Sequence, residues 1–319
     1  MVCERHFVSQ VCTAPPRFGN EMGEFVNAFG FAVVANRTFV LAADTCSTYL
    51  DFSGRILRDS DVQAMTSEAG CKIGFPKLLI KHGEPLRKQP IDSAAPDAWA
   101  SERHVMTRFW HEEVAHRVLA NEQLGAEATR RAKSLFGTSV LLGYGALFHA
   151  AWAFKDSVRI PVDEMLRDHA DVFKVGLHVR HSGNCRAGCR ENVRAAQCVK
   201  NILSERTSQK CVVLIATDHP ESEADLAQQV QSTLMGGREN ASLASVELLN
   251  LEQLAKHIEA ATGCKARSTL VSQKVVQPDF AEEHGPWAMY SSVADLYMLS
   301  RSDALVVGYS GSGNSSFSE

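Results

Sequence analysis

An arginine in the second half of the chain lies where parallel-sheet proteins hold ligands. Residues 175–180 read Val-Gly-Leu-His-Val-Arg, a buried strand whose last residue, Arg180, meets the crevice beyond the carboxyl end of the sheet. A guanidinium stays charged and forks onto two oxygens at once, which suits a phosphate better than a lysine ammonium does. His178, two residues earlier, is expected on the same strand face. The pattern predicts an anion site; the alternative is a surface arginine at a strand end.

The last residues of the sequence offer a second element suited to an anion. Residues 304–308 predict a buried strand, and a loop rich in Ser and Gly follows it up to Phe317. Backbone N–H groups in such a loop, followed by a helix N-terminus, form a cradle for a phosphate. The loop is neither a Walker loop nor a dinucleotide fingerprint, because the required glycine spacing and Lys are missing. The alternative is a flexible loop. Because the sequence stops at Glu319, we expect it to be truncated at the helix that would follow.

A third segment, Arg17-Phe-Gly-Asn20, stands directly before a helical stripe of apolar residues over 21–35. Gly19 permits a tight turn, and Asn20 is a favourable N-cap for that helix. Taken without its context, the segment predicts a cap and nothing more.

Three patterns contain metal-ligating residue types, but none of them predicts a metal site. The second histidine of 111–116 falls at i+5 and leaves the helix face that a zinc protease needs. The two His and two Cys of 178–189 are ligand types for zinc, but strand geometry points His178 and His181 to opposite faces. Asp59-Ser-Asp61 follows no buried strand, so we expect an exposed turn there.

Composition excludes several classes of protein. The 319 residues are 45% hydrophobic and 22% charged, as in an ordinary soluble globular chain, which excludes bulk disorder, collagen and disulfide scaffolds. The net charge of −4 and the lack of basic clusters argue against a nucleic-acid partner, because such proteins need basic surface to displace counterions from phosphates. A single phosphate-bearing small molecule stays compatible with this charge.

Strands alternate with helices in the second half of the sequence. Val, Leu and Ile fill both faces of these strands, which is typical of a parallel sheet covered on two sides. Such a sheet binds ligands beyond the carboxyl ends of its strands, so the residues just after each strand are expected to carry the function. The predicted strands are 175–180, 211–216, 246–249 and 304–308, and the predicted helices are 190–204, 221–234, 252–261 and 291–300.

The first half has a weaker pattern. A short buried strand is predicted over 39–42 and a long helix around 99–121, while residues 51–96 look like loops and short elements. Residues 136–154 lack formal charges over nearly the length of a membrane span. They contain three glycines and His149, so we predict a buried strand–turn–helix and no span.

The ends and the cysteines leave the compartment open. The first residues hold no apolar stretch long enough for a signal sequence, and we expect none in this chain. Three Asn-x-Ser/Thr sequons occur, at Asn36, Asn240 and Asn314, and they are weak indicators of a secretory route. Nine Cys are spread along the sequence, so one thiol stays unpaired if the others bridge, and Cys211 is predicted to be a core residue.

Four segments together resemble a known family. Residues 16–38, His178-Val-Arg180, the Ala-Thr-Asp at 216–218, and 294–318 are similar, in the same order, to protein O-fucosyltransferases and to the wider GDP-fucose-dependent fucosyltransferases. Residues 45–170 match no family that we can name. The resemblance implies an α/β protein of GT-B architecture, with two Rossmann-like lobes whose parallel sheets face each other across a cleft. We place an acceptor-side lobe at 1–165 and a GDP-sugar donor lobe at 166–319.

The resemblance also implies roles for particular residues. The family's catalytic arginine, which contacts the donor diphosphate, matches Arg180, and Asn20 is expected near the reacting sugar. Arg180 would stabilise the charge on the departing diphosphate, so no metal or other cofactor is needed, and the sugar centre is inverted. A general base is not identifiable. Donor binding is expected from His178, Gly19, Asp218, Asp295, Ser315, Ser316 and Phe317.

The expected partners are GDP-fucose and an acceptor, either Ser/Thr of a folded protein domain or a glycan hydroxyl. By the same resemblance, the expected compartment is the lumen of the endoplasmic reticulum or the Golgi. Three alternatives stay open: a glycan-directed fucosyltransferase of α-1,6 or α-1,2 type, a catalytically inactive sugar-nucleotide-binding protein, and a zinc-binding interaction domain.

Overall fold

In the computed structural model, the chain divides into two compact units, Met1–Ala153 and Phe154–Ser318. The sequence predicts a boundary after residue 165. In the structure the second unit begins at Phe154 and so includes the helix Asp156–Leu166. The structure describes residues 4–12, 18–44, 50–54, 56–71, 78–81, 103–108, 126–181, 190–206, 210–217, 220–236, 246–249 and 292–310.

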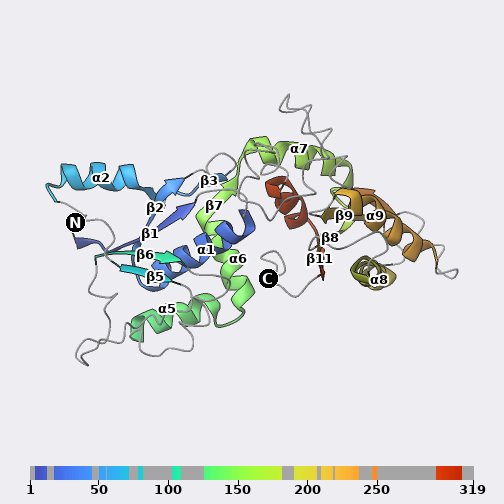
Figure 1. Ribbon diagram of the computed structural model, residues 1–319, viewed down its shortest axis with the longest axis horizontal. Helices are drawn as coiled ribbons and strands as arrows, with labels where there is room; N and C mark the ends of the chain where they lie inside the picture. Colours follow the sequence, from blue (N-terminus) through green and yellow to red (C-terminus); the bar gives the residue numbers. More distant parts are fainter. Residues whose placement is uncertain are drawn as a thin grey trace. The chain divides into compact units, whose positions relative to one another are not determined.

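The first unit is built on a five-stranded sheet of order β4-β2-β1-β6-β5, in which every neighbouring pair is parallel (Figure 1). Parallel strands need long crossovers, which explains why neighbours in the sheet are distant in the sequence. The strands are β1 (Phe7–Cys12), β2 (Thr38–Asp44), β4 (Leu57–Arg58), β5 (Leu78–Lys81) and β6 (His104–Arg108).

Helices cover both faces of this sheet, because side chains of opposite faces alternate along each strand. On one face, Phe7 and Val40 pack with Val62 of α2 (Asp59–Glu68). On the other face lies α1 (Phe18–Val34), whose Phe25 ring meets the Phe39 ring edge-on at 5.1 Å between centroids. Two further helices, α5 (Ala126–Phe136) and α6 (Val140–Ala151), pack against α1.

Aromatic side chains fill the space beside α1. Phe25 lies 4.9 Å from Trp152, and Trp152 lies 4.3 Å from Phe148, measured between ring centroids. Trp152 begins β7 (Trp152–Phe154), which forms a separate two-stranded sheet with β3 (Leu50–Phe52). The uncharged stretch over 136–154 is therefore a helix followed by a short strand, in place of the predicted strand–turn–helix.

Among the described residues, no single helix is long and apolar enough to cross a membrane. The helices Ala126–Phe136 and Val140–Ala151 pass that test only as a pair, and they are bent by 94° relative to each other.

Two further sequence predictions for the first unit are wrong. A long helix was expected around 99–121, but the described residues in this range form a strand, β6. Its Val105 is fully buried, and the strand lies between β1 and β5. Pairing on both edges of a strand outweighs local helix propensity, which is a weak preference. The first helix begins at Phe18, so Asn20 lies in its first turn and is not the N-cap. Helix ends are the part of an element that sequence determines least.

The second unit contains a four-stranded parallel sheet of order β10-β9-β8-β11. Its strands are β8 (Phe173–His181), β9 (Cys211–Thr217), β10 (Val246–Leu249) and β11 (Ala304–Ser310), and its helices include α7 (Asp156–Leu166), α8 (Arg190–Ser204), α9 (Pro220–Met235) and residues 292–300. A short 3-10 helix, Arg167–His169, follows α7. The predicted strand–helix alternation is confirmed, except for the helix expected at 252–261, which lies outside the described residues.

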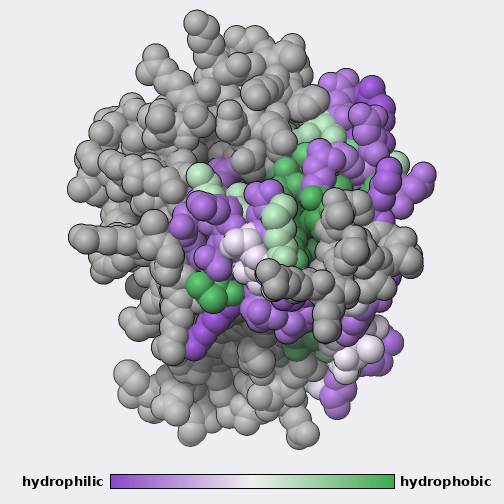
Figure 2. All heavy atoms as spheres, turned by 90° about the vertical axis from the view of Figure 1, so that its right-hand side faces the viewer, coloured by the Kyte–Doolittle hydropathy of each residue, from purple (hydrophilic) through white to green (hydrophobic). Residues whose placement is uncertain are grey.

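One core packs α8 and α9 on this sheet. Leu177 and Ile215 from the strands and Val199 and Leu226 from the helices are fully buried in one cluster. Cys211 is also buried there, as predicted. Figure 2 views the molecule from the side of these helices, where the described surface is mostly hydrophilic with hydrophobic side chains between. The helices are thus amphipathic layers on the sheet.

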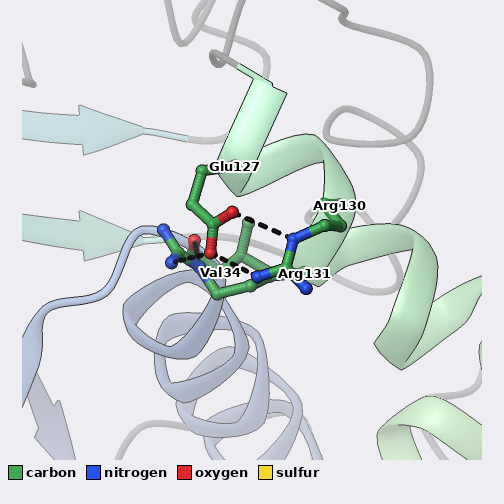
Figure 3. A network of polar contacts seen from close by, with 4 residues as sticks. All are labelled: Val34, Glu127, Arg130 and Arg131. Atoms are coloured by element: carbon green, nitrogen blue, oxygen red, sulfur yellow. Dashed lines mark hydrogen bonds and ion pairs between the residues drawn. The ribbon is translucent and has the colours of Figure 1, made fainter.

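The C-terminal end of α1 is held by a cation from α5 (Figure 3). The Nε of Arg131 donates a hydrogen bond of 2.8 Å to the carbonyl oxygen of Val34, and its Nη1 lies 2.9 Å from Glu127. Arg130 binds the same carboxylate at 2.7 Å, but from an exposed position. The last carbonyls of a helix lack intrahelical partners and carry partial negative charge, so Arg131 supplies what α1 lacks.

We predict that Arg131→Met lowers the free energy of unfolding by about 1–2 kcal/mol, because it leaves a helix-end carbonyl without its charged donor. Arg130→Met is the matched control, since that exposed pair holds no helix end and surface pairs contribute little. Urea denaturation of both variants tests this. Equal effects of the two substitutions would refute the capping role.

Candidate functional site

Several strands end, and two helices begin, at the carboxyl edge of the second sheet. β8, β9 and β11 end at His181, Thr217 and Ser310, and because they are parallel they end on the same side (Figure 1). The helices α8 and α9 begin after two of these strands and run back along the sheet. This is the edge at which open α/β sheets bind ligands.

His178 lies on the sheet face opposite to the α8–α9 core. Its neighbours Leu177 and Val179 belong to that core, so alternation turns His178 to the other side. There it pairs in register with Ala216 of β9 and Val307 of β11. Both ring nitrogens are shielded from solvent. His178 is therefore a positioned side chain near the end of β8 and not a solvated one.

Gly176 allows the helix at 292–300 to lie close to this face. A Cβ atom at Gly176 would stand 2.8 Å from the Ser302 hydroxyl, 3.0 Å from Leu305 and 3.1 Å from Leu299. All three contacts are with the ends of side chains, so a larger residue at 176 would make these side chains shift, and glycine leaves them their present packing. The beginnings of β8 and β11 are also tied together, because Lys174 and Asp303 exchange two hydrogen bonds of 2.8 Å.

The packing of this helix beside Gly176 places Asp295 near the carboxyl edge of the sheet. Asp295 precedes Leu299 by four residues and shares its helix face, about 6 Å closer to the start of the helix. The helix runs antiparallel to β8, along which His178 lies about 7 Å beyond Gly176. The predicted donor-binding residues Asp295 and His178 are thus at the same end of the same face.

Asp295 is an unusual carboxyl group. Its Oδ1 atom is buried and has no hydrogen-bond partner within the described part of the chain. Burial raises the pKa of Asp295 well above its ordinary value, and the nearby carboxylate of Glu223 raises the pKa further. Glu223 itself is only 9% exposed and lies in the second turn of α9. A buried acceptor oxygen of this kind would accept N–H donors from a ligand.

A hydrogen bond between helices supports this edge. The Nδ2 of Asn192, a fully buried residue of α8, donates to Oδ2 of Asp225 on α9 at 3.0 Å. The bond fixes the beginnings of the two helices relative to each other. Asn192, Asp225 and Glu223 were not predicted, because nothing in their spacing distinguishes them from the polar face of a helix.

The other predicted residues are only partly described. The backbone of Arg180 lies in β8, one residue before its end, and pairs in register with Tyr309. Its predicted position at the carboxyl end of the strand is thus confirmed, and its role remains a prediction. Asp218, Ser315, Ser316 and Phe317 lie outside the described residues, as do Cys185 and Cys189.

In the first unit, Gly19 and Asn20 lie in the first turn of α1. One turn further along, Glu24 is only 6% exposed, and its Oε2 accepts a hydrogen bond of 3.4 Å from Nε2 of Gln10 on β1. Asn27, another turn on, donates to the carbonyl of Gly23 at 2.8 Å. The Glu24–Gln10 contact therefore attaches α1 to the sheet in addition to the aromatic packing, whereas the Asn27 bond lies within the helix.

No group of three or more His, Cys, Asp or Glu residues that could hold a metal ion occurs among the described residues. Asp59 and Asp61 have a different explanation. Both lie in the first turn of α2, where Asp61 accepts a hydrogen bond of 2.8 Å from the backbone N–H of Arg58 and Asp59 accepts one from Gln63. They stabilise a helix beginning, whereas the sequence indicated an exposed turn.

We predict that Asp295→Asn becomes more stable relative to the wild type as the pH rises, measured as the difference between their free energies of unfolding. The raised pKa means that the native state keeps a proton that the unfolded state releases, so wild-type stability is full below the ordinary carboxyl pKa. It then falls by up to about 1.4 kcal/mol for each pH unit until the folded-state pKa is reached. Urea denaturation from pH 4 to pH 8 measures this difference. The exposed Asp168→Asn is the control, and parallel curves for both variants would contradict the prediction.

Comparisons with known proteins agree with this architecture. No family model matches the sequence, and no curated protein does either. Among solved structures, Arabidopsis thaliana FUT1, a mutant in complex with GDP, superimposes with a TM-score of 0.57 at 13% identity, over 95% of this chain. This chain spans 66% of the FUT1 chain.

Two weaker matches have the same coverage of this chain. NodZ α-1,6-fucosyltransferase, soaked with GDP-fucose, matches with a TM-score of 0.46 at 14% identity, over 95% of this chain and 88% of its own. POFUT1 in complex with GDP-fucose matches with a TM-score of 0.40 at 10% identity, over 95% of this chain and 98% of its own. The predicted α/β class with two Rossmann-like, parallel-sheet lobes is confirmed. In its fold, this chain is therefore similar to Arabidopsis thaliana FUT1.

Proposed function

We propose that the chain is a fucosyltransferase that moves fucose from GDP-fucose to a hydroxyl group of a protein or a glycan. The observation that carries the proposal is the common fold with FUT1, a protein solved with GDP, over 95% of this chain. The position of the His178-Val-Arg180 motif at the carboxyl end of β8 supports it. The first unit would receive the acceptor, and the second would bind the donor.

The reaction breaks the bond between C1 of fucose and the diphosphate oxygen. The electron pair of that bond leaves with GDP, while the acceptor oxygen attacks the opposite face of the sugar, releases its proton and inverts the centre. Negative charge grows on the diphosphate as the bond breaks, so a fixed cation there stabilises the transition state more than the ground state. We assign this role to Arg180, which makes a metal ion unnecessary.

The remaining predicted residues divide between donor and acceptor. Asp295 supplies a buried carboxyl oxygen suited to the N–H donors of a nucleotide base, and His178 lies at the same end of β8. Asp218, Ser315, Ser316 and Phe317 complete the donor site in the proposal. At the start of α1, Gly19 contributes to donor binding and Asn20 lies near the reacting sugar in the proposal.

We further propose that the chain works in the lumen of the endoplasmic reticulum or the Golgi. Cys71, directly after α2, is disulfide-bonded. Disulfides form and persist in oxidising compartments and are rare in the cytosol. The disulfide supports a secretory location.

Arg180→Lys is expected to lower turnover by a factor on the order of 10²–10³, because a point charge replaces a fork that matches two oxygens. Release of GDP from GDP-fucose, with folded protein domains and free oligosaccharides as separate acceptors, measures it. Arg301→Lys is the matched control, because Arg301 precedes β11 at the opposite edge of the same sheet. Near-wild-type turnover of Arg180→Lys would remove Arg180 from the mechanism.

Nucleotide binding tests the donor assignment separately. Titration calorimetry is expected to show that the wild type binds GDP more tightly than UDP or ADP and that Arg180→Ala loses most of this affinity. Equal binding of the three nucleotides would contradict the proposed donor, and GDP binding without turnover on any acceptor would favour an inactive sugar-nucleotide-binding protein.

A further inference from the structure

A buried tyrosine joins the helix at 292–300 to α7. Tyr297 is only 8% exposed, and its hydroxyl donates to the carboxylate of Asp163 on α7, at 3.0 Å to Oδ1 and 3.2 Å to Oδ2. The Tyr297 ring packs on the Phe154 ring at 4.9 Å between centroids. The hydroxyl and the ring of one residue thus make two different contacts.

Tyr297 and Asp295 lie on different sides of this helix. Successive residues of an α-helix are turned by about 100°, so two residues apart means about 200°. Asp295 shares the face of Leu299, and Leu299 lies close to Gly176 of β8, so this face meets the sheet. Tyr297 faces α7 instead. The helix therefore lies between the sheet and α7, with the predicted donor-binding residue on one side and the tyrosine on the other.

The tyrosine contact opposes an unfavourable interaction on the other side of the helix. The Oδ1 atom of Asp295 is buried and has no hydrogen-bond partner among the described residues, and the acidic Glu223 acts on this carboxyl group. Desolvation and like charge favour movement of the helix away from the sheet. A helix of nine described residues also depends on packing for its position, because helices this short are marginal alone. The bond to α7 supplies a restraint from behind.

The Tyr297–Asp163 bond has the properties of a strong restraint. Burial and the hydrogen bond to Asp163 raise the pKa of Tyr297, so the hydroxyl keeps the proton that it donates. Hydrogen bonds to a charged acceptor are stronger than those between neutral groups. The Nε of Arg301 also approaches Asp163, at 3.6 Å, but the Arg301 side chain is 54% exposed, and exposed pairs contribute little. Tyr297 is therefore the stronger of these two contacts of Asp163.

We propose that Tyr297 and Asp163 are positioning residues of the donor site, whose bond holds the helix on the sheet and so keeps the Asp295 carboxyl group in place for the nucleotide base. Neither residue touches the donor. Guanine offers a carboxylate adjacent N–H donors at N1 and N2, whereas adenine has an acceptor at N1. The pair would therefore control base selectivity, and not the diphosphate contact assigned to Arg180. The inference rests on the proposed function, which assigns Asp295 to the base.

Three variants test the bond. Tyr297→Phe removes the hydroxyl and keeps the ring that packs on Phe154. Asp163→Ala removes the acceptor, and Asp163→Asn keeps a carbonyl oxygen that can still accept the hydrogen bond. Asp156→Asn is the matched control, because Asp156 begins the same helix and pairs with Arg159 of that helix at 2.6 Å. Titration calorimetry of the full chain with GDP and with ADP gives both dissociation constants for each variant.

The ratio of the ADP to the GDP dissociation constant is expected to fall by about tenfold in Tyr297→Phe and in Asp163→Ala, less in Asp163→Asn, and not in the control. The ADP dissociation constant itself is expected to stay the same, whereas a general loss of structure would weaken both nucleotides alike. Combining Tyr297→Phe with Asp163→Ala is expected to lower the ratio no further than either change alone, because both act through one bond.

A wild-type ratio in folded Tyr297→Phe, with folding checked by circular dichroism, would overturn the positioning role and leave the proposed function intact. Equal lowering of GDP and ADP affinity would overturn it as well, because the contact would then be structural only. A wild type without preference for GDP over ADP would contradict the proposed donor, and the positioning role would fall with it.

Discussion

The close approach of the helix at 292–300 to β8 is the contact on which the proposed donor edge depends. Gly176 favours it, because a single added carbon atom would meet the side-chain ends of Ser302, Leu305 and Leu299 at 2.8–3.1 Å. With the helix seated there, its first turn reaches the carboxyl end of the sheet, and Asp295 arrives at the same end as His178.

The resulting site carries an electrostatic conflict. Asp295 and Glu223 are two neighbouring acidic groups. Glu223 is 9% exposed, Asp295 is partly exposed with its Oδ1 buried, and desolvation together with Glu223 raises the pKa of Asp295. An acidic group held in this way opposes folding in its ionised form, because desolvating a charge is unfavourable without a partner. Proteins keep such groups where ligands supply the missing partner, and perturbed carboxyls gather at functional sites for that reason. The conflict is therefore an argument for function at this edge and against a purely structural role.

In the first unit, α1 runs between the two opposite edges of the sheet. α1 is attached to the sheet by the Glu24–Gln10 contact near its beginning and is capped by Arg131 at its end. The beginning lies at the edge proposed to receive the acceptor, and the end leads into the Asn36 turn at the opposite edge.

The local sequence pattern was sufficient for the elements whose core is contiguous in the chain. The residues of β8, α8, β9 and β10 follow from runs of buried apolar side chains and from helical periodicity, and they agree with the structure to within two residues. The position of Arg180 at the end of a strand follows in the same way, since a motif and its strand are adjacent in the sequence. β6 does not follow, because its strand character comes from pairing with β1 and β5, and neither partner is its neighbour in the chain.

Contacts between distant residues were decided only by the packing of the whole chain. The proximity of Asp295 and Glu223, and the hydrogen bond from Asn192 to Asp225, join segments that are dozens of residues apart. Residue types alone contain no distance information of this kind, because a buried polar residue and a solvated one are the same letter in a sequence. Residues 175–180 and 304–308 were recognisable as strands that could present a ligand site. The burial of the Asp295 Oδ1 atom depends on how the helix at 292–300 packs in the folded chain.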